Sequence, residues 1–400
     1  MKPKTPKFLA VDFFCGAGGT TRGLIDAGGY VIAGIDKDPA CELTYTSNNA
    51  NASIDYSQAR FLCKDIFRKT EDHPEGQQRE IIKELKSNIE YYRAKAPHAP
   101  LFFAICAPCQ PFTKVSKKAL SEERKAGRAK DSNLLLESLV FVKKFKPDII
   151  LSENVPGIRQ ERYGCVWDEF EEQLSKLGYA VGSKVVCASK FGVPQFRKRS
   201  ILLAVKKNIV RPTYFSDMLM QEILIPTQDP KSCIKSVEDA IGHFPCLGAG
   251  EAHDQIPNHR TRWLSETNIK RITLAKPGES NKYLDGTGLE LDCHKRMRKK
   301  NGPGGFGDVY TRLVADKPSG TITTKCHSIS NGRFGHYDTS QNRGISLREA
   351  AALQSFPDDY RFYPEDGIDP VARMIGNAVP PRLAEYFANY AIASLKTGDA

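Results

Sequence analysis

The sequence predicts an α/β protein built on a doubly wound parallel sheet, with a smaller irregular domain beside it. Up to about residue 206, apolar runs with strand-like patterning alternate with segments whose apolar residues recur at helical spacing. This order is typical of parallel βαβ units. After about residue 206, segments rich in Pro, Gly and polar residues replace the alternation, which indicates a domain with little regular structure.

The expected strands are short and apolar, and the expected helices lie between them. We predict strands at 7–14, 30–36, 101–106, 148–153, 180–186 and 200–205. We predict helices at 20–28, 80–94, 133–145 and 167–178. In the second of these, Ile81, Leu85 and Ile89 share one face, as an amphipathic helix requires.

Two further helices are expected near the C-terminus. Residues 346–356 begin with Ser346 and carry Glu349 three positions later, which is the spacing of a capping box. Residues 380–395 begin with two prolines, which a helix tolerates in its first turn because the missing N–H would have no partner there. Between them, Gly376-Asn377 is expected in a tight turn.

The composition is that of a globular chain with a real core. The 400 residues are 40% hydrophobic and 26% charged, which suits two domains or one large domain with an insertion. No apolar run reaches the roughly 18 residues of a membrane span. The N-terminal apolar stretch is interrupted by Asp12, so we expect no signal peptide. The 11 cysteines form no disulfide framework, which favours a reducing cytoplasm.

The chain is basic, with a net charge of +11. Excess Lys and Arg attract polyanions such as nucleic acids, although solubility explains a net charge equally well. The charge is concentrated in two segments, KVSKKALSEERKAGRAK (114–130) and HKRMRKK (294–300). Both are expected in loops.

The first predicted strand leads into DFFCGAGG at 12–19. Glycines there permit a sharp turn and a close approach of a ligand to a helix N-terminus. The second strand ends at Asp36, about 20 residues further on, where a carboxylate accepts hydrogen bonds from ribose hydroxyls in nucleotide-binding folds. A glycine-rich turn alone is a weak signal; together with Asp36 it indicates an adenosine-containing cofactor.

The stretch CAPCQPFT (106–113) follows the strand expected at 101–106. A zinc site would need two further ligands at matching spacing, and the sequence has no second C-x-x-C, so we expect no metal. A redox dithiol is disfavoured by Pro111, which would disturb the helix that such a motif begins. A single reactive thiol at Cys109 and two buried thiols both remain open from this stretch alone.

Two polar groups also follow predicted strands. Glu153 lies just beyond an apolar run, where a carboxyl group can be desolvated and act as an acid; a turn cap is the alternative. Gln195, Arg197 and Arg199 occupy alternate positions entering a strand, so all three should share one face. Two guanidinium groups there suit an anionic or carbonyl-rich ligand, and a solvated strand edge is the alternative.

These segments together closely resemble the cytosine-5 DNA methyltransferase family, of the prokaryotic restriction-modification type. The resemblance rests on blocks in the family's order: DFFCGAGG, GIDKDPA, KDI (64–66), APCQPF, SENVPGI, QFRKR, SLREAAALQSFP and GNAVPP. It spans roughly residues 8–383. It implies a Rossmann-like, S-adenosylmethionine-dependent domain at 1–206 plus 371–400, a target-recognition domain at 207–340, and a hinge at 341–370.

The resemblance also implies roles for individual residues. Cys109 would attack C6 of a flipped-out cytosine, Glu153 would contact its N3 and amine, and Arg199 would hold its O2, with Arg197 and Gln195 organising that site. The residues implied to bind S-adenosylmethionine are Phe14, Gly16, Gly18, Asp36, Asp65 and Asn377. The residues considered for DNA contact are Gln195, Lys117, Lys118, Arg260, Arg262, Arg296 and Arg298.

The implied partner is double-stranded DNA, with a cognate restriction endonuclease acting on the same site. A cytoplasmic monomer from a bacterium, archaeon or phage is expected, with no membrane association. The main alternative is a tRNA cytosine-5 methyltransferase on the same scaffold.

Overall fold

The computed structural model describes residues 5–108, 133–159, 161–299 and 306–396. The chain forms two compact units. The first, which we call the sheet unit, comprises Met1–Phe191, Lys198–Lys231 and Val379–Ala400. The second unit comprises Gly192–Arg197 and Ser232–Ala378. Among the described residues, no helix is both long enough and apolar enough to cross a bilayer.

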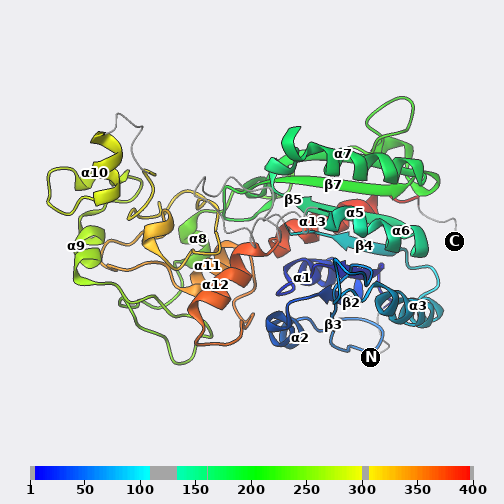
Figure 1. Cartoon of the computed structure of the whole chain (residues 1–400), viewed down its shortest axis with the longest axis horizontal. Helices are drawn as coiled ribbons and strands as arrows, with labels where there is room; N and C mark the ends of the chain where they lie inside the picture. The colour runs from blue at the N-terminus through cyan, green and yellow to red at the C-terminus, as the bar shows by residue number, and fades with distance from the viewer. Residues whose placement is uncertain (1–4, 109–132, 160, 300–305, 397–400) are drawn as a thin grey trace. The chain divides into compact units, whose positions relative to one another are not determined.

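The sheet unit is built on a seven-stranded sheet of order β3-β2-β1-β4-β5-β7-β6 (Figure 1). Its strands are β1 (Leu9–Phe13), β2 (Tyr30–Asp36), β3 (Arg60–Cys63), β4 (Leu101–Ile105), β5 (Ile149–Asn154), β6 (Tyr179–Cys187) and β7 (Lys198–Lys206). The predicted α/β class is confirmed, and six of these strands match predictions or overlap them. β3 was missed because it has only four residues and lies at the sheet edge with a single buried side chain.

One strand departs from the expected parallel arrangement. β7 runs antiparallel to both of its neighbours, β5 and β6, whereas the other pairs are parallel. The connection from β6 to β7 is residues 188–197 only. A parallel return in the same sheet needs a crossover of a dozen or more residues, so the short connection forces the reversal.

Helices cover both faces of the sheet. They are α1 (Gly19–Asp26), α2 (Glu42–Asn48), α3 (Gln78–Lys95), α5 (Leu134–Glu137), α6 (Leu139–Phe145), α7 (Glu161–Lys176) and α13 (Pro381–Ala393). Side chains of α3, α5, α6 and α7 share a buried core with alternate residues of β1, such as Val11 and Phe13. α1 and α13 pack against each other, and α13 also contacts β5. The helix expected at 133–145 is interrupted at Ser138.

The second unit has little regular structure, as predicted. Its helices are α8 (Val237–Ile241), α9 (Glu266–Leu274), α10 (Asp292–Lys299), α11 (Leu347–Leu353) and α12 (Ile368–Asn377), and in its described residues β-pairing is limited to isolated bridges. In place of sheet hydrogen bonds, the side chain of Arg312 links several segments of this unit. Its buried guanidinium donates to carbonyl oxygens of Ile272, Ala275, His336, Asp338 and Gln341, which satisfies loop groups that burial would otherwise leave unpaired.

Two predictions for the C-terminal helices have different outcomes. The capping box of Ser346 and Glu349 is present at the start of α11, so this prediction is confirmed. Gly376-Asn377 forms the last turn of α12, so the expected free-standing turn before the final helix is wrong. Gly376 is needed because a Cβ there would lie 2.3 Å from backbone atoms of Thr323 and Thr324.

The compact units differ from the expected domain boundaries. Residues 207–231 belong to the sheet unit, because Arg211 N–H donates to the carbonyl of Ser394 (2.8 Å) and the Tyr390 hydroxyl donates to that of Leu224 (2.7 Å). The segment expected as a hinge, 341–370, lies within the second unit. It is held there by Arg348, whose buried guanidinium donates to the carbonyl oxygen of Pro257 (3.1 Å).

Candidate functional site

The glycine loop after β1 adopts a backbone that most residues avoid. Gly16 and Gly18 have φ values of 49° and 90°, which glycine adopts without steric cost. Phe14 also has a positive φ of 62°. Gly18 forms the left-handed cap of α1. A ligand can therefore approach the backbone of this loop closely, at the start of a helix.

Asp36 holds this loop from the end of β2. Its Oδ2 accepts a hydrogen bond from Gly16 N–H (2.9 Å), and its Oδ1 accepts one from Asp38 N–H (2.9 Å). Burial raises the pKa of the Asp36 carboxyl, and these two N–H donors lower it. Each carboxylate oxygen retains a further lone pair, so the group can accept hydroxyl donors while it supports the loop.

Asp65 lies at the same edge of the sheet as Asp36. β2 and β3 are parallel, with Asp36 opposite Cys63, and Asp65 follows two residues later. Its Oδ1 accepts a hydrogen bond from Phe67 N–H (2.9 Å). The structure therefore brings Phe14, Gly16, Asp36 and Asp65 to the carboxyl edge of neighbouring strands, which is where open α/β sheets bind ligands.

Asp12 is a buried group of this region that the sequence interpretation did not select. The Thr21 hydroxyl donates to its Oδ2 (2.7 Å) and lies 3.0 Å from the Tyr45 hydroxyl. Burial raises the pKa of Asp12 to about 7. The sequence signal was present, since Asp12 is the single charged residue in the apolar run FLAVDFF.

The end of β5 supports the segment that leads to Cys109. The Ser152 hydroxyl donates to the carbonyl of Ile105 (2.6 Å), and the Asn154 amide donates to that of Ala107 (3.1 Å). These bonds fix the chain just after β4. Cys109 itself lies outside the described residues. Asn154 and Ser152 thus position this segment, a role that the sequence alone did not assign to them.

Glu153 and Arg199 form an ion pair in the sheet unit. Arg199 Nε lies 2.7 Å from Glu153 Oε1, and the two side chains are 10% and 11% exposed. The antiparallel pairing of β5 with β7 brings them together, because it places Glu153 opposite Ile201 and Asn154 opposite Ser200. A nearly buried carboxylate beside a guanidinium can present both a proton-accepting oxygen and N–H donors to a planar polar ligand.

Cys106 is unsuited to act as the nucleophile. It lies just beyond β4 rather than at its end, and burial together with the charges of Glu153 and Asp12 raises the pKa of its thiol well above its ordinary value. A thiol in these surroundings stays protonated, whereas the thiolate is the reactive form.

Gln195 and Arg197 lie in the second unit. The predicted alternation is confirmed, since residues 195, 197 and 199 are buried and residues 196 and 198 are exposed. The Gln195 amide donates to Gln354 Oε1 (2.7 Å) and accepts from Ile322 N–H (2.9 Å). Because Gln195 is fully buried, a direct DNA contact by this residue is inconsistent with the structure.

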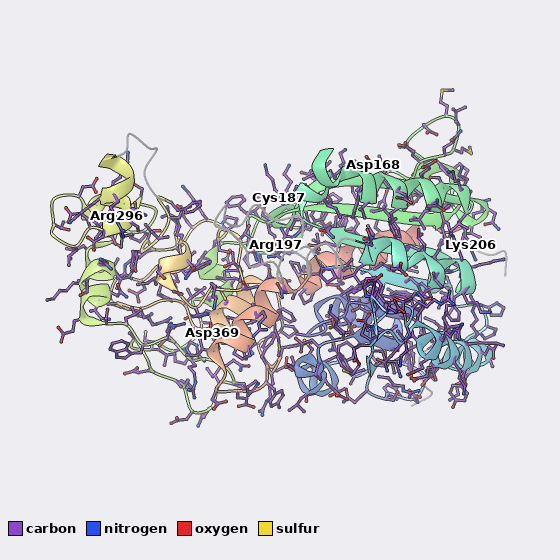
Figure 2. The ribbon with its side chains drawn as sticks, viewed as in Figure 1. Asp168, Cys187, Arg197, Lys206, Arg296 and Asp369 are labelled. Carbon is purple, nitrogen blue, oxygen red and sulfur yellow. The ribbon has the colours of Figure 1, made fainter. Side chains whose placement is uncertain are left out.

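Arg197, labelled in Figure 2, donates hydrogen bonds to the backbone of its own unit. Its guanidinium donates to the carbonyl oxygens of Ile322 (3.0 Å), Gly376 (3.2 Å) and Ala378 (3.2 Å). Asn377, between the last two, is exposed at the end of α12. Arg197 therefore fixes the backbone on either side of Asn377.

The residues considered for DNA contact are spread over several elements. Lys117 and Lys118 lie outside the described residues, as does the side chain of Arg298. Arg296 is exposed on α10, labelled in Figure 2. Arg262 is about half exposed and lies 3.7 Å from Asp369.

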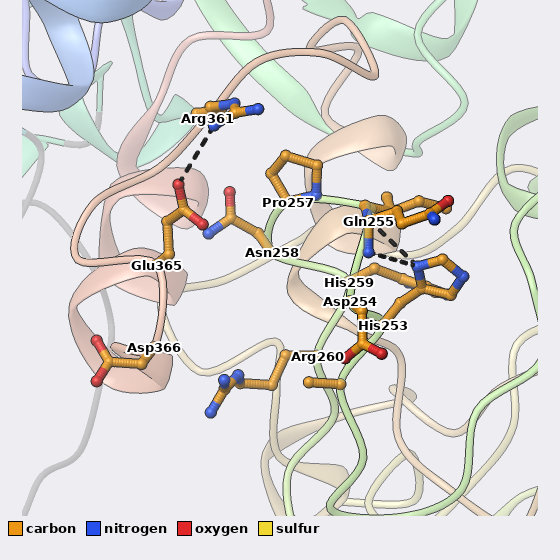
Figure 3. Close-up of a pocket in the computed structure, with 12 residues that line it drawn as sticks. His253, Asp254, Gln255, Pro257, Asn258, His259, Arg260, Arg361, Glu365 and Asp366 are labelled. Atoms are coloured by element: carbon orange, nitrogen blue, oxygen red, sulfur yellow. Dashed lines mark hydrogen bonds and ion pairs between the residues drawn. The ribbon is translucent and has the colours of Figure 1, made fainter.

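Arg260 lines a polar pocket of the second unit with a volume of about 320 Å³ (Figure 3). The walls are residues 252–260 with Arg361, Glu365 and Asp366. His253 Nδ1 accepts from the N–H groups of Gln255 (3.1 Å) and Ile256 (3.2 Å), so its ring proton is on Nε2. Apart from Arg260, none of the site residues expected from the sequence lines this pocket. Within the described residues, no cluster of three His, Cys, Asp or Glu side chains could hold a metal ion.

Comparison with known proteins gives concordant results. The model of the family "C-5 cytosine-specific DNA methylase" matches residues 8–392. The type II methylase M.HgiDII of Herpetosiphon aurantiacus is 34% identical over 381 residues, covering 94% of this chain and 93% of its own. The type II methyltransferase M1.HphI of Haemophilus parahaemolyticus is 28% identical, with 97% and 87% covered.

Solved structures share the fold. A methyltransferase proposed to modify DNA, encoded within an E. coli prophage, aligns with a TM-score of 0.64 at 20% identity, covering 97% of this chain and 99% of that one. The S. pombe Dnmt2 methyltransferase aligns with a TM-score of 0.55 at 15% identity, covering 96% and 98%.

Proposed function

Because the chain belongs to the C-5 cytosine-specific DNA methylase family, we propose that it methylates C5 of one cytosine within a specific double-stranded DNA sequence, as part of a type II restriction-modification system. The observation that carries the site assignment is the Glu153–Arg199 pair (2.7 Å). Glu153 lies near the end of β5, and the last residue of that strand, Asn154, holds the segment leading to Cys109.

The glycine loop and the carboxyl edge of the sheet fit S-adenosylmethionine. Gly16 and Gly18 have no Cβ and so allow close approach. Asp36 retains acceptor capacity for ribose hydroxyls, and Asp65, which follows the neighbouring strand, is proposed to accept from the adenine amine. Bound there, S-adenosylmethionine would supply an electrophilic methyl group. Phe14 would pack against the adenine, and a contact by Asn377 stays a prediction.

Cys109 is proposed as the nucleophile. Its thiolate would add to C6 of cytosine, and the electrons of the C5–C6 double bond would then attack the methyl group, whose bond to the sulfonium sulfur would break and leave S-adenosylhomocysteine. The C5 proton would then leave, and expulsion of the thiolate would restore the double bond. This covalent route divides a difficult step into easier ones.

Glu153 and Arg199 would act on the polar edge of the base. Glu153 would hydrogen-bond to N3 and the exocyclic amine and offset the charge that builds on the ring as the thiolate adds. Arg199 would hold O2 while it fixes Glu153. We propose that Arg197 positions the site through its three backbone contacts, which agrees with the organising role that the resemblance implies.

The target cytosine is stacked inside a duplex, so it would have to be extruded at a cost of a few kcal/mol. Lys117 and Lys118, which follow Cys109 in the sequence, are proposed to contact DNA. Arg260, Arg262, Arg296 and Arg298 are proposed to contact phosphates or base edges from the second unit, phosphates being the more frequent partner of such residues.

The alternative tRNA substrate gains no support. The matching family model is that of DNA methylases, and the similarity to Dnmt2 proteins shows the fold alone. A companion nuclease is proposed from the names of the type II relatives. Those relatives come from bacteria, and a cytoplasmic monomer stays a prediction.

Covalent trapping tests the mechanism. Duplex DNA with 5-fluorocytosine at the target should form an adduct stable to denaturation, because the C5 fluorine cannot leave as a proton. Cys109→Ser should abolish both the adduct and methyl transfer while duplex binding remains. Cys106→Ala is the matched control and should retain substantial activity. Equal loss in both cysteine variants would contradict the assignment of Cys109, and bisulfite mapping of modified DNA would identify the site.

A further inference from the structure

Three basic side chains of the second unit converge on one carboxylate. Asp369, in the first turn of α12 and labelled in Figure 2, lies 2.6 Å from Lys325 Nζ, 3.3 Å from His327 Nε2 and 3.7 Å from Arg262 Nη1. We call these four residues the Asp369 cluster. They come from three separate segments of the second unit, so the arrangement is a product of the fold.

His327 connects Arg262 to the carboxylate. Arg262 Nη1 lies 3.1 Å from His327 Nδ1, and since a guanidinium only donates, Nδ1 must accept. The ring proton is therefore on Nε2, facing Asp369. Burial lowers the pKa of His327, which keeps the ring neutral. His327 thus fixes the direction of Arg262 without adding charge.

The cluster carries more positive than negative charge. Lys325 and Arg262 are cationic and His327 is neutral, and among the residues that the structure describes Asp369 is the only acid paired with them. The side chains of Arg262, Lys325 and Asp369 are 47%, 54% and 51% exposed. One positive charge is therefore unbalanced at a surface that an anion can reach.

The charged side chains of the Asp369 cluster are far more exposed than those of a buried ion pair in the same unit. Arg343 and Glu349 are 0% and 1% exposed, at 2.7 Å, and separating them would leave a buried charge unpaired. Half-exposed pairs such as Lys325–Asp369 contribute little to stability. The cations of the Asp369 cluster can therefore change partner at small cost.

We propose that Asp369 takes the place of a DNA backbone phosphate in the free protein. It holds Lys325 and Arg262 in a fixed arrangement and releases both to phosphates of the duplex. Its charge also opposes those phosphates, so it weakens binding to DNA of any sequence and leaves discrimination to contacts with the bases. This inference rests on the proposed function, because the duplex is its partner.

The test measures binding of the full chain to a duplex lacking the target sequence, as a function of salt. Asp369→Asn should tighten binding about fivefold at low salt, the size of one charge–charge interaction at about 4 Å in water. Lys325→Gln should make the slope of log K against log salt shallower by about 0.9, the value for one phosphate contact. In a Lys325→Gln, Arg262→Gln background, the gain from Asp369→Asn should fall to less than half.

Glu172→Gln is the matched control. Glu172 pairs with Lys176 at 2.6 Å on the exposed surface of α7, so the variant makes the same change in net charge elsewhere. Asp369→Ser, which suits the first turn of a helix, is a second variant should Asp369→Asn not fold, as judged by circular dichroism.

The outcomes separate this inference from the proposed function. The inference would be overturned if Asp369→Asn tightened DNA binding no more than Glu172→Gln does. It would also be overturned if the tighter binding persisted when both Lys325 and Arg262 are replaced. Saturable binding of inorganic phosphate that disappears in Lys325→Gln would assign the cluster to a free anion and would also overturn it. Failure of the unaltered protein to bind any duplex at low salt would count against the proposed function instead.

Discussion

A carboxyl group buried beneath the glycine loop should make the stability of the sheet unit depend on pH. Burial raises the pKa of Asp12 to about 7 from its ordinary value of 3.8. Between these values the folded protein keeps a proton that the unfolded chain has released. The contribution of Asp12 to the free energy of unfolding should therefore be largest below about pH 4 and should decrease as the pH rises toward 7.

Asp12→Asn removes this titration. Its free energy of unfolding, measured in urea at several pH values between 5 and 8, should increase relative to that of the unaltered protein as the pH rises. Asp26→Asn, an exposed α1 residue paired with Arg22, is the control and should not reproduce the trend. Parallel curves for Asp12→Asn and the unaltered protein would show that Asp12 is ionised in the folded state.

At the residue scale, the sequence predicts positions better than partners. The glycine positions and Asp36 could be located because they are close in sequence and follow strand ends. The shared face of Gln195 and Arg197 followed from their alternation. Their partners could not be found, because those of Arg197 lie 125 and 179 positions away. The Glu153–Arg199 contact also required the reversed direction of β7, which depends on the length of the β6–β7 connection and not on the residue pattern of the strand itself.

At the scale of elements, α1 and α13 approach so closely that one hydrogen atom is the largest side chain that fits at position 23. A Cβ on Gly23 would lie 2.3 Å from the carbonyl oxygen of Pro381 and 2.8 Å from Ala384 Cβ. Gly23→Ala should therefore destabilise the protein by about 1–3 kcal/mol through overpacking, although alanine normally favours a helix by up to about 1 kcal/mol.

Urea denaturation measures this effect. Gly320→Ala is the matched control, because a Cβ there meets no atom within 4 Å, and its unfolding midpoint should change little. A stabilised Gly23→Ala protein would show that helix propensity outweighs the contact and that α13 can move away from α1.

Elements with strong periodicity were predictable, and weak or context-dependent ones were not. The long helix α3 and the capped helix α11 have clear local signals. β3 has four residues and α2 has seven, too few for a periodic pattern to emerge. The last turn of α12 was mistaken for a free turn because glycine and asparagine are typical turn residues, whereas Gly376 is required by close packing on residues 323–324.

For the whole molecule, the order of segments decides which part of the chain can fold alone. The sheet unit is assembled from three segments, and its inner strand β7 and its helix α13 both follow parts of the second unit. A chain of residues 1–191 alone would lack β7, leaving β5 and β6 without a partner between them. It would also lack α13, exposing the surface of α1 around Gly23.

Removal of residues 232–378 should instead leave a foldable sheet unit. The Tyr386 hydroxyl lies 3.4 Å from the carbonyl oxygen of Gln228, so residues 231 and 379 are within roughly 30 Å and a flexible linker of about ten residues can join them. This shortened chain should unfold cooperatively in urea, with a smaller m-value because it buries less surface. The 1–191 chain, its matched control, should show no such transition. Equal cooperativity in both would mean that β7 and α13 are dispensable, contrary to their central place in the packing.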